Sequence, residues 1–338
     1  MANHFTSYIV EERSYVSFIK REIHQKVVAA QFTHKQQGEI DIIISEITSN
    51  LIKHAARGEI LYRVLPIEGS SPIFEVLCLD KGPGMADPAK MMKDGISTTK
   101  TLGNGLGAME RLSNLFQIFT LPKWGTIVYA KVGKPTERIP RKPGFSVEVK
   151  TLCVPKLGEL VCGDGFSVKQ TEDFINIFFG DGLGHGPPAK DAVDQAAKFF
   201  QECPETDPVI ILRQMHEVAK KTRGLVASVA VLNRTSGQWS LCGLGNILTK
   251  LYTGIEYKNY LSYNGAVGLN IPNSMKASTI PAERNQHLIM CSDGLQSRWD
   301  LLKYPSVFKY DNTLLAAALY KDFSRGTDDS SSLIAKVI

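Results

Sequence analysis

The stretch Gly180-Asp181-Gly182-Leu183-Gly184-His185-Gly186 does most to define the fold and function of this chain. Before it, residues 174–179 (FINIFF) form a short apolar run that predicts a buried strand. After it, residues 189–200 follow two prolines, which predicts a helix with its prolines near the start. A carboxylate thus lies at a strand end, in a glycine-rich loop that a ligand can approach closely. Taken alone, the loop is equally consistent with an ordinary turn.

The composition is that of a soluble protein with a full hydrophobic core. Of 338 residues, 43% are hydrophobic and 22% are charged, and the length suggests two domains. The net charge of +5 is too small and too scattered to favour nucleic-acid binding. The six cysteines form no C-x-x-C pair, the first residues show neither a charged n-region nor an apolar h-region, and no apolar run approaches the ~20 residues that span a bilayer. We therefore expect a reduced, cytoplasmic protein with no nucleic-acid or membrane partner.

The order of predicted elements indicates an α+β fold in two parts. Residues 133–144 hold three prolines and four basic residues, which is typical of an extended linker. We therefore predict domains at 1–133 and 145–338, joined by a linker at 134–144. The first should contain helices and strands at 9–31, 35–56, 60–65, 73–79, 108–115, 116–121 and 126–132. The second should contain them at 145–154, 159–162, 174–179, 189–202, 207–222, 225–232, 239–244, 248–252, 286–291, 314–323 and 331–337.

Three motifs of the first domain together predict a nucleotide-binding pocket. Glu46 and Asn50 are four residues apart and share one face of a predicted helix. Asn50 can ligate Mg²⁺ with a neutral oxygen while phosphates supply the charge. Asp80, at a strand end, can accept a hydrogen bond from an adenine amino group. Two glycines, Gly82 and Gly84, follow Asp80 in the same turn. The motifs are completed by a glycine loop whose backbone N–H groups can meet phosphate at a helix N-terminus, with Gly103, Gly105 and Gly107.

Each motif alone is also consistent with a solvated helix face or a turn. In this order they resemble the GHKL ATP-binding fold, and within it the RsbT- and RsbW-like serine kinases of bacterial anti-sigma switches. The matching runs are SEITSNLIKHA, DKGPGM and GNGLGAMERL, and the resemblance covers nearly all of residues 1–133. It implies a Bergerat-type α/β sandwich that binds ATP with Mg²⁺. In it, Asn50 would hold the Mg²⁺, Asp80 would contact adenine, and Glu46 would be the general base toward a protein serine hydroxyl.

Four aspartates of the second domain, each near the junction of a strand and a glycine turn, predict a metal site: Asp164, Asp181, Asp293 and Asp328. Gathered in one pocket, they would raise each other's pKa values unless cations neutralised them. Oxygen-only ligands select Mg²⁺ or Mn²⁺. Two such ions, about 3.5–4 Å apart, would activate a water and hold a phosphoryl group. We expect His185 to pack the loop rather than to act as a general acid.

These motifs resemble the metal-dependent PPM phosphatases of the SpoIIE/RsbU/RsbX branch. The matching runs are VCGDG, FGDGLGHGPPA, CGLGN, CSDGL and GTDDSSSLIAKV, through most of residues 150–338. The resemblance implies a β-sandwich flanked by helices, in which Asp181 bridges two Mn²⁺ or Mg²⁺ ions and the Gly182 carbonyl assists. Asp164, Asp293 and Asp328 would complete the metal shells, with Asp329 ranked below Asp328.

Together the two halves suggest a bacterial switch protein. The leading hypothesis is a metal-dependent protein serine/threonine phosphatase that acts on a phosphorylated STAS-type anti-sigma antagonist. Its first domain would bind ATP and either rephosphorylate that partner or gate the phosphatase. The alternative is an ATP-gated, anti-sigma-like module that docks a partner without turnover. A pseudophosphatase scaffold is disfavoured because all four carboxylates are present.

Overall fold

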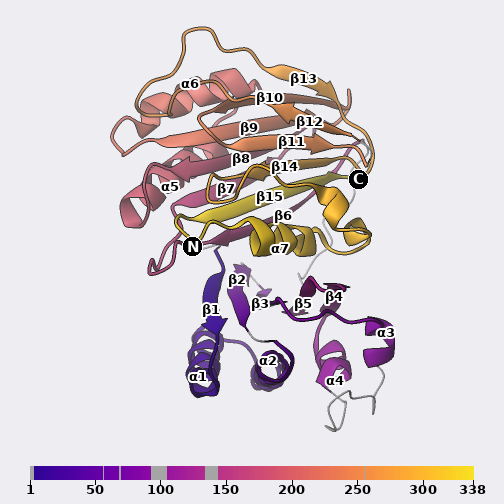
Figure 1. Cartoon of the computed structure of the whole chain (residues 1–338). Coiled ribbons are helices and arrows are strands. Elements are labelled where there is room, and N and C mark those ends of the chain that lie inside the picture. The colour runs from indigo at the N-terminus through magenta and orange to yellow at the C-terminus, as the bar shows by residue number, and fades with distance from the viewer. Residues whose placement is uncertain (1–3, 56, 68–69, 93–104, 134–143, 255) are drawn as a thin grey trace. The chain divides into compact units, whose positions relative to one another are not determined.

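Figure 1 shows the fold, a computed structural model that describes residues 4–55, 57–67, 70–92, 105–133, 144–254 and 256–338. The chain divides into two compact units. One comprises Phe5–Ile139 with Tyr304–Ala318, and the other comprises Met1–His4, Pro140–Lys303 and Leu319–Ile338. The predicted linker lies almost wholly outside the described residues, so the domain limits 1–133 and 145–338 stay a prediction.

The first unit is built on a five-stranded antiparallel sheet with strand order β1-β2-β3-β5-β4. Two long helices, α1 and α2, pack on one face of this sheet, and their buried side chains form a single core with it (Figure 1). The element bounds are β1 Thr6–Val10, α1 Arg13–Ala29, α2 His34–His54, β2 Gly58–Ile67, β3 Ser70–Asp80, α3 Pro88–Met91, α4 Gly105–Leu112, β4 Leu115–Leu121 and β5 Gly125–Val132.

Helix α2 begins and packs as its sequence predicts. Thr33 and Gln36 form a capping box, in which the Gln36 backbone N–H donates to Thr33 Oγ1 at 3.3 Å and the Thr33 N–H donates to Gln36 Oε1 at 3.1 Å. The isoleucines at helical spacing are all buried against the sheet. The predicted helix over 9–31 is wrong at its start, because residues 6–10 pair with β2 as an edge strand and the helix begins at Arg13.

The second unit is a sandwich of two five-stranded sheets, with orders β13-β10-β9-β8-β7 and β12-β11-β14-β15-β6. One apolar core lies between the sheets, and a second lies between the first sheet and helices α5 and α6. The element bounds are β6 Val147–Val154, β7 Asp164–Gln170, β8 Phe174–Gly182, α5 Pro187–Glu202, α6 Pro208–Ala219, β9 Leu225–Asn233, β10 Gln238–Leu244, β11 Leu248–Tyr252, β12 Tyr257–Tyr260, β13 Ser278–Pro281, β14 His287–Cys291 and β15 Ser330–Val337. The remaining helix, α7 Asn312–Phe323, is divided between the two units after Ala318. The predicted α+β fold, with its helix-flanked sandwich, is confirmed.

Three strands of this sandwich differ from the prediction. Residues 159–162 form no strand, and β7 instead begins at Asp164, where its pairing with β8 starts. Strands β12 and β13 were not predicted, because these four-residue edge strands are mostly exposed and carry no apolar alternation.

All six cysteines are buried and free, as small hydrophobic residues of a core. Burial raises the pKa of the Cys78 and Cys162 thiols well above the usual value, which keeps them protonated and unreactive. Within the described ranges, no helix is both long enough and apolar enough to cross a membrane.

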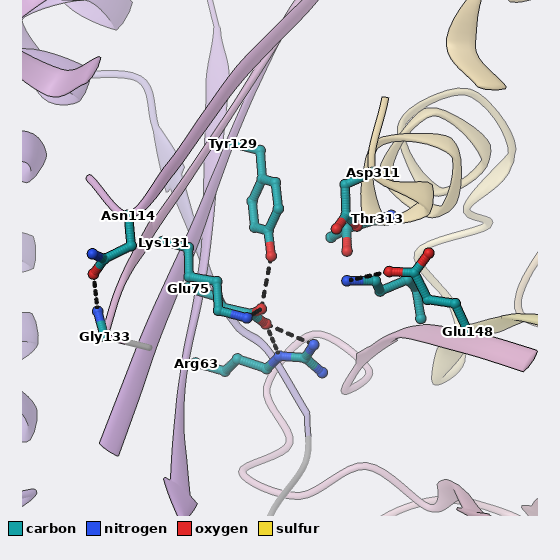
Figure 2. Close-up of polar contacts among 10 residues, drawn as sticks. Arg63, Glu75, Asn114, Tyr129, Lys131, Gly133, Glu148, Asp311 and Thr313 are labelled. Atoms are coloured by element: carbon teal, nitrogen blue, oxygen red, sulfur yellow. Dashed lines mark hydrogen bonds and ion pairs between the residues drawn. The ribbon is translucent and has the colours of Figure 1, made fainter. Parts of the chain in front are cut away.

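A buried ion-pair network lies on β2, β3 and β5 of the first unit (Figure 2). Glu75 is only 3% exposed, and its Oε2 accepts hydrogen bonds from Nε and Nη2 of Arg63, both at 2.7 Å. Its Oε1 accepts from the Tyr129 hydroxyl at 2.7 Å and lies 3.5 Å from Lys131 Nζ. Arg63 also lies over the Phe5 ring, 4.3 Å from its centroid. The sheet register creates this network by placing Arg63 and Lys131 on either side of Glu75.

Candidate functional site

Strand β8 carries Asp181 at the edge where the carboxylates of the second unit gather. Its register with β7 pairs Asp181 directly with Asp164, so the two carboxylates are cross-strand neighbours. Asp164 is buried, and its Oδ2 accepts a hydrogen bond from Ser292 Oγ at 2.7 Å. Because Ser292 precedes Asp293 in the turn after β14, this bond ties that turn to β7.

Electrostatics show that Asp293 and Asp328 belong to the same group. Burial raises the pKa of Asp181 well above its usual value, and the negative charges of Asp164, Asp293 and Asp328 raise it further. Burial also raises the pKa of Asp164 to about 7, although the Ser292 hydrogen bond opposes the rise. The structure therefore brings together the four carboxylates that the sequence singled out.

The residue types of this group fit a hard divalent cation. All four side chains offer carboxylate oxygens, and a cation would relieve the repulsion that helps to raise the pKa of Asp164 and of Asp181. As the structure stands, no three His, Cys, Asp or Glu side chains in the described part of the chain converge closely enough to hold a metal. Gly182 has no room for a side chain, since a Cβ there would overlap the Ala189 backbone. Metal binding by these residues and by the Gly182 carbonyl stays a prediction.

Asp329, next to Asp328, has a different place in the structure. Its carboxylate is buried and accepts two backbone hydrogen bonds, from Lys156 N–H to Oδ1 and from Gly163 N–H to Oδ2, each at 2.8 Å. Asp328, in contrast, is partly exposed, and its charge acts on Asp181. Asp329 therefore holds the loop between β6 and β7 in place, while the charge of Asp328 acts on Asp181.

We expect Asp329→Ala to destabilise the protein by about 2–4 kcal/mol, because it leaves two backbone donors without their acceptor. The matched change Asp328→Ala should cost less, since it removes a single backbone hydrogen bond, from the Asp329 N–H at 2.9 Å, together with a charge that repels Asp181. Urea unfolding of both variants, without added metal, measures the difference. Equal losses from the two variants would contradict the role given to Asp329.

A hydrogen bond between two side chains fixes the loop after Asp181. His185 Nδ1 lies 2.7 Å from Glu159 Oε1, and both side chains are partly exposed. Gly184 has a φ of +86°, a backbone conformation that favours glycine. A Cβ on Gly186 would lie 2.9 Å from Glu159 Oε2, so the glycine lets Glu159 approach the loop closely.

Two polar residues at this site were not identified from the sequence. Asn246 Nδ2 donates to Asp293 Oδ2 at 2.8 Å, and Ser292 donates to Asp164 as described. Both lie within the quoted runs CGLGN and CSDGL. A polar residue beside a glycine turn was the available signal, but only the fold shows which carboxylate each one contacts.

In the first unit, α2 carries Glu46 and Asn50, both partly buried. Gly105 begins α4, and a Cβ there would overlap Glu46 Oε2, so the start of α4 packs directly against this carboxylate. Gly107 lies in the first turn of α4 and is buried. Gly103 lies outside the described residues.

Asp80 lies at the end of β3, in a turn that several polar contacts fix. Its Oδ1 accepts hydrogen bonds from the Gly82 N–H at 2.7 Å and from the Thr126 N–H at 3.2 Å. Gly82 also lies close to α2, since a Cβ there would be 3.1 Å from the His54 carbonyl oxygen. The structure therefore brings the end of α2 to the Asp80 turn.

The hydroxyl of Thr120, which the sequence did not single out, supports the same turn. It donates to the Gly125 carbonyl at 2.9 Å and accepts from the Met85 N–H at 2.9 Å. Gly84, with a φ of +78°, lies within this turn. Threonine is common in strands, so only the fold reveals that Thr120 and Thr126 hold the turn.

The folds and sites of the two units define a class: a histidine kinase-like ATPase domain followed by a PPM-type phosphatase sandwich. The family model of the histidine kinase-like ATPase domain matches residues 12–131. The serine/threonine-protein kinase RsbT of Bacillus subtilis is 33% identical over 94 residues, which are 28% of this chain and 70% of RsbT. The chain therefore belongs, through its first domain, to the histidine kinase-like ATPase family that includes RsbT.

The second domain is similar to known phosphatases. The phosphoserine phosphatase RsbX of Bacillus subtilis is 27% identical over 163 residues, which are 47% of this chain and 81% of RsbX. A structure described with the bacterial stressosome matches with a TM-score of 0.53 and 27% identity, covering 56% of this chain and 100% of that chain. A structure of RsbX in complex with magnesium matches with a TM-score of 0.50 and 22% identity, over 60% of this chain and 99% of that one. The predicted fusion of a GHKL kinase-like domain with a PPM phosphatase domain is confirmed.

Proposed function

We propose that the chain is a metal-dependent protein serine/threonine phosphatase that acts on a phosphorylated STAS-type partner in a bacterial partner-switching pathway. The observation that carries the proposal is the group of four carboxylates around Asp181, whose charges raise its pKa. The similarity to the phosphoserine phosphatase RsbX supports a phosphoserine substrate. The similarity to RsbT and to a stressosome structure supports a switching pathway.

In this proposal, Asp181, Asp164, Asp293 and Asp328 hold two Mn²⁺ or Mg²⁺ ions, with the Gly182 carbonyl. When bound, such ions supply an activated water and Lewis-acid stabilisation of a phosphoryl group. Ser292 and Asn246 orient the Asp164 and Asp293 carboxylates through their hydrogen bonds. Asp329 and Glu159 keep the two adjoining loops in place.

The first domain binds ATP with Mg²⁺ in the same proposal. Asp80, oriented by Gly82 and Thr126, accepts a hydrogen bond from the adenine amino group. Asn50 holds the Mg²⁺, and the N-terminus of α4 directs backbone N–H groups toward the phosphates. Glu46 serves as the general base toward a partner's serine hydroxyl.

A second candidate function is an ATP-gated docking module without kinase turnover. The close packing of the α4 start against Glu46 favours it, because this contact covers the carboxylate that would act as base. The two functions can be distinguished by measuring transfer of ³²P from ATP to a STAS protein, with the full wild-type chain and with the Glu46→Gln variant. Transfer that depends on Glu46 supports the kinase, and ATP binding without transfer supports the docking module.

We expect Asp80→Asn to weaken ATP binding by about 10- to 100-fold, because a charge-assisted hydrogen bond to the base is lost. Calorimetric titration of the full chain with ATP and Mg²⁺ measures the affinity. Asp87→Asn is a matched control, since Asp87 is an exposed cap of the short helix α3. An unchanged affinity in Asp80→Asn would remove Asp80 from the proposed site.

The substrate assignment is tested with a phosphoserine-containing STAS protein from the same genome. Incubation with the full chain and Mn²⁺ should release inorganic phosphate and restore the unmodified protein, as mass spectrometry of the phosphorylated peptide would show. If the protein hydrolyses a small phosphoester but releases no phosphate from any STAS protein, the phosphatase activity stands and the STAS substrate class is rejected.

A further inference from the structure

We propose that Arg223 binds the phosphate group of the substrate, an inference that rests on the phosphatase function proposed above. Arg223 lies in the turn between α6 and β9, two residues before Leu225, whose partner in the sheet is Gly182. The Leu183 N–H donates to the Gly224 carbonyl at 3.1 Å and extends this pairing beyond the strand end. This pairing therefore places Arg223 beside Gly184, in the loop that follows Asp181.

The guanidinium of Arg223 lies directly over Gly184. Its Nη1, Cζ and Nη2 atoms are 3.1, 3.2 and 3.3 Å from the position that a Cβ on Gly184 would occupy. The similar distances of these three atoms mean that the planar group approaches the loop broadside. Gly184, three residues after Asp181 in the sequence, thus leaves room for the Arg223 side chain.

The turn that carries Arg223 is held firmly. The Thr222 hydroxyl donates to the Ala219 carbonyl at 2.7 Å and accepts from the Gly224 N–H at 3.1 Å. Gly224 has a φ of +84° and packs closely against Val267. The backbone beneath the guanidinium is therefore fixed by the same strand end that positions Asp181.

Among the described residues, Arg223 has no carboxylate partner, unlike His185 and Lys190 near the same loop. It is exposed, and no hydrogen bond or ion pair joins its side chain to another residue of the described chain. His185, on the same loop, pairs with Glu159, and Lys190, on α5, pairs with Asp194. Arg223 therefore keeps its donors available for a ligand.

A phosphomonoester dianion fits this free cation. Gly184 lies in the loop that follows Asp181, so a phosphate group at the proposed site would lie on the side of the loop where the Arg223 guanidinium offers a positive charge. Guanidinium binds phosphate oxygens through two parallel hydrogen bonds, which a lysine ammonium cannot reproduce. Arg223 is thus a substrate-binding residue, distinct from the proposed metal ligands.

Titration of the full chain with inorganic phosphate in the presence of Mg²⁺ tests this role without turnover. We expect Arg223→Gln to raise the Kd for phosphate about tenfold, and Arg223→Lys to raise it less. The KM for p-nitrophenyl phosphate with Mn²⁺ should rise in parallel while kcat changes little, because the residue binds the group rather than activates it. Lys221→Gln removes the same charge two residues away and should leave both values unchanged.

An unchanged phosphate Kd in Arg223→Gln would overturn the proposal, as would an equal effect of Lys221→Gln. These results are distinguishable from failure of the phosphatase function. If the wild-type protein hydrolyses no phosphoester with Mn²⁺ or Mg²⁺, the function fails, while the phosphate titration still reports on Arg223. If Asp181→Asn is inactive but Arg223→Gln binds phosphate normally, the function stands and only the role of Arg223 is lost.

Discussion

Asp181→Asn should abolish hydrolysis of p-nitrophenyl phosphate with Mn²⁺, lowering kcat/KM by about 10³-fold or more. Asp181 is the carboxylate on which the charges of Asp164, Asp293 and Asp328 all act, so a cation held among these residues depends on it most. The loss of several kcal/mol of metal-dependent stabilisation corresponds to a rate effect of that size. Initial rates over a range of Mn²⁺ concentrations measure it, and excess metal should not restore activity.

The same substitution should stabilise the protein without metal. The pKa of Asp181 is raised in the folded state, so its ionisation opposes folding. Stability from this group is full below the ordinary aspartate pKa and is lost as pH rises through the folded pKa. At pH 7.5, in EDTA, Asp181→Asn should therefore melt a few degrees above wild type. Added Mn²⁺ should raise the wild-type Tm and leave that of the variant unchanged.

Asp173→Asn provides the control for both measurements. Asp173 is exposed and precedes β8 at the end opposite Asp181, so its replacement should change neither rate nor Tm. Mn²⁺-dependent activity that persists in Asp181→Asn would contradict the assignment of Asp181 to the metal site. A lower metal-free Tm in the variant would show instead that Asp181 is held by contacts that favour its charged form.

The four aspartates of the carboxylate group could be predicted because each lies in a short, recognisable sequence motif. Each of the four aspartates lies next to a glycine turn or an Asp pair at a strand end, and antiparallel strands bring such ends to shared edges. The spacing of the isoleucines in α2 is likewise a local signal, and they are buried as predicted. Periodicity and turn chemistry therefore predicted the elements and the main candidate residues, while the sandwich architecture was implied by the family resemblance.

The remaining site residues depend on register, which local patterns do not contain. Asn246 reaches Asp293 only because β11 follows its glycine turn beside β14. Arg223 approaches Gly184 because β9 pairs with β8 in one particular alignment. A shift of one residue in either pairing would displace the turn that carries each side chain and so remove its contact. Sequence patterns leave that alignment open, so these contacts require the fold.

The buried network around Glu75 also depends on strand register, and its disruption has the largest expected effect on stability (Figure 2). Glu75→Ala should destabilise the first unit by about 3–5 kcal/mol, because it leaves the buried Arg63 guanidinium without its partner. Urea unfolding measures the loss. Hydrogen exchange of peptides from β2, β3 and β5 assigns it to this sheet. Glu11→Ala, which breaks the exposed Glu11–Arg57 pair, should cost less than about 1 kcal/mol.

Two further measurements separate charge pairing from packing. The double variant Arg63→Met/Glu75→Leu removes both charges and should recover most of the stability that Glu75→Ala loses. Burial raises the pKa of Glu75, but Arg63, Tyr129 and Lys131 outweigh it and hold that pKa below the usual 4.5. The wild type should therefore lose stability as pH falls below about 4.5, through the folded pKa of Glu75, and the double variant should lose less. A double variant as unstable as Glu75→Ala, with the same pH dependence as wild type, would mean that shape rather than charge makes Glu75 necessary.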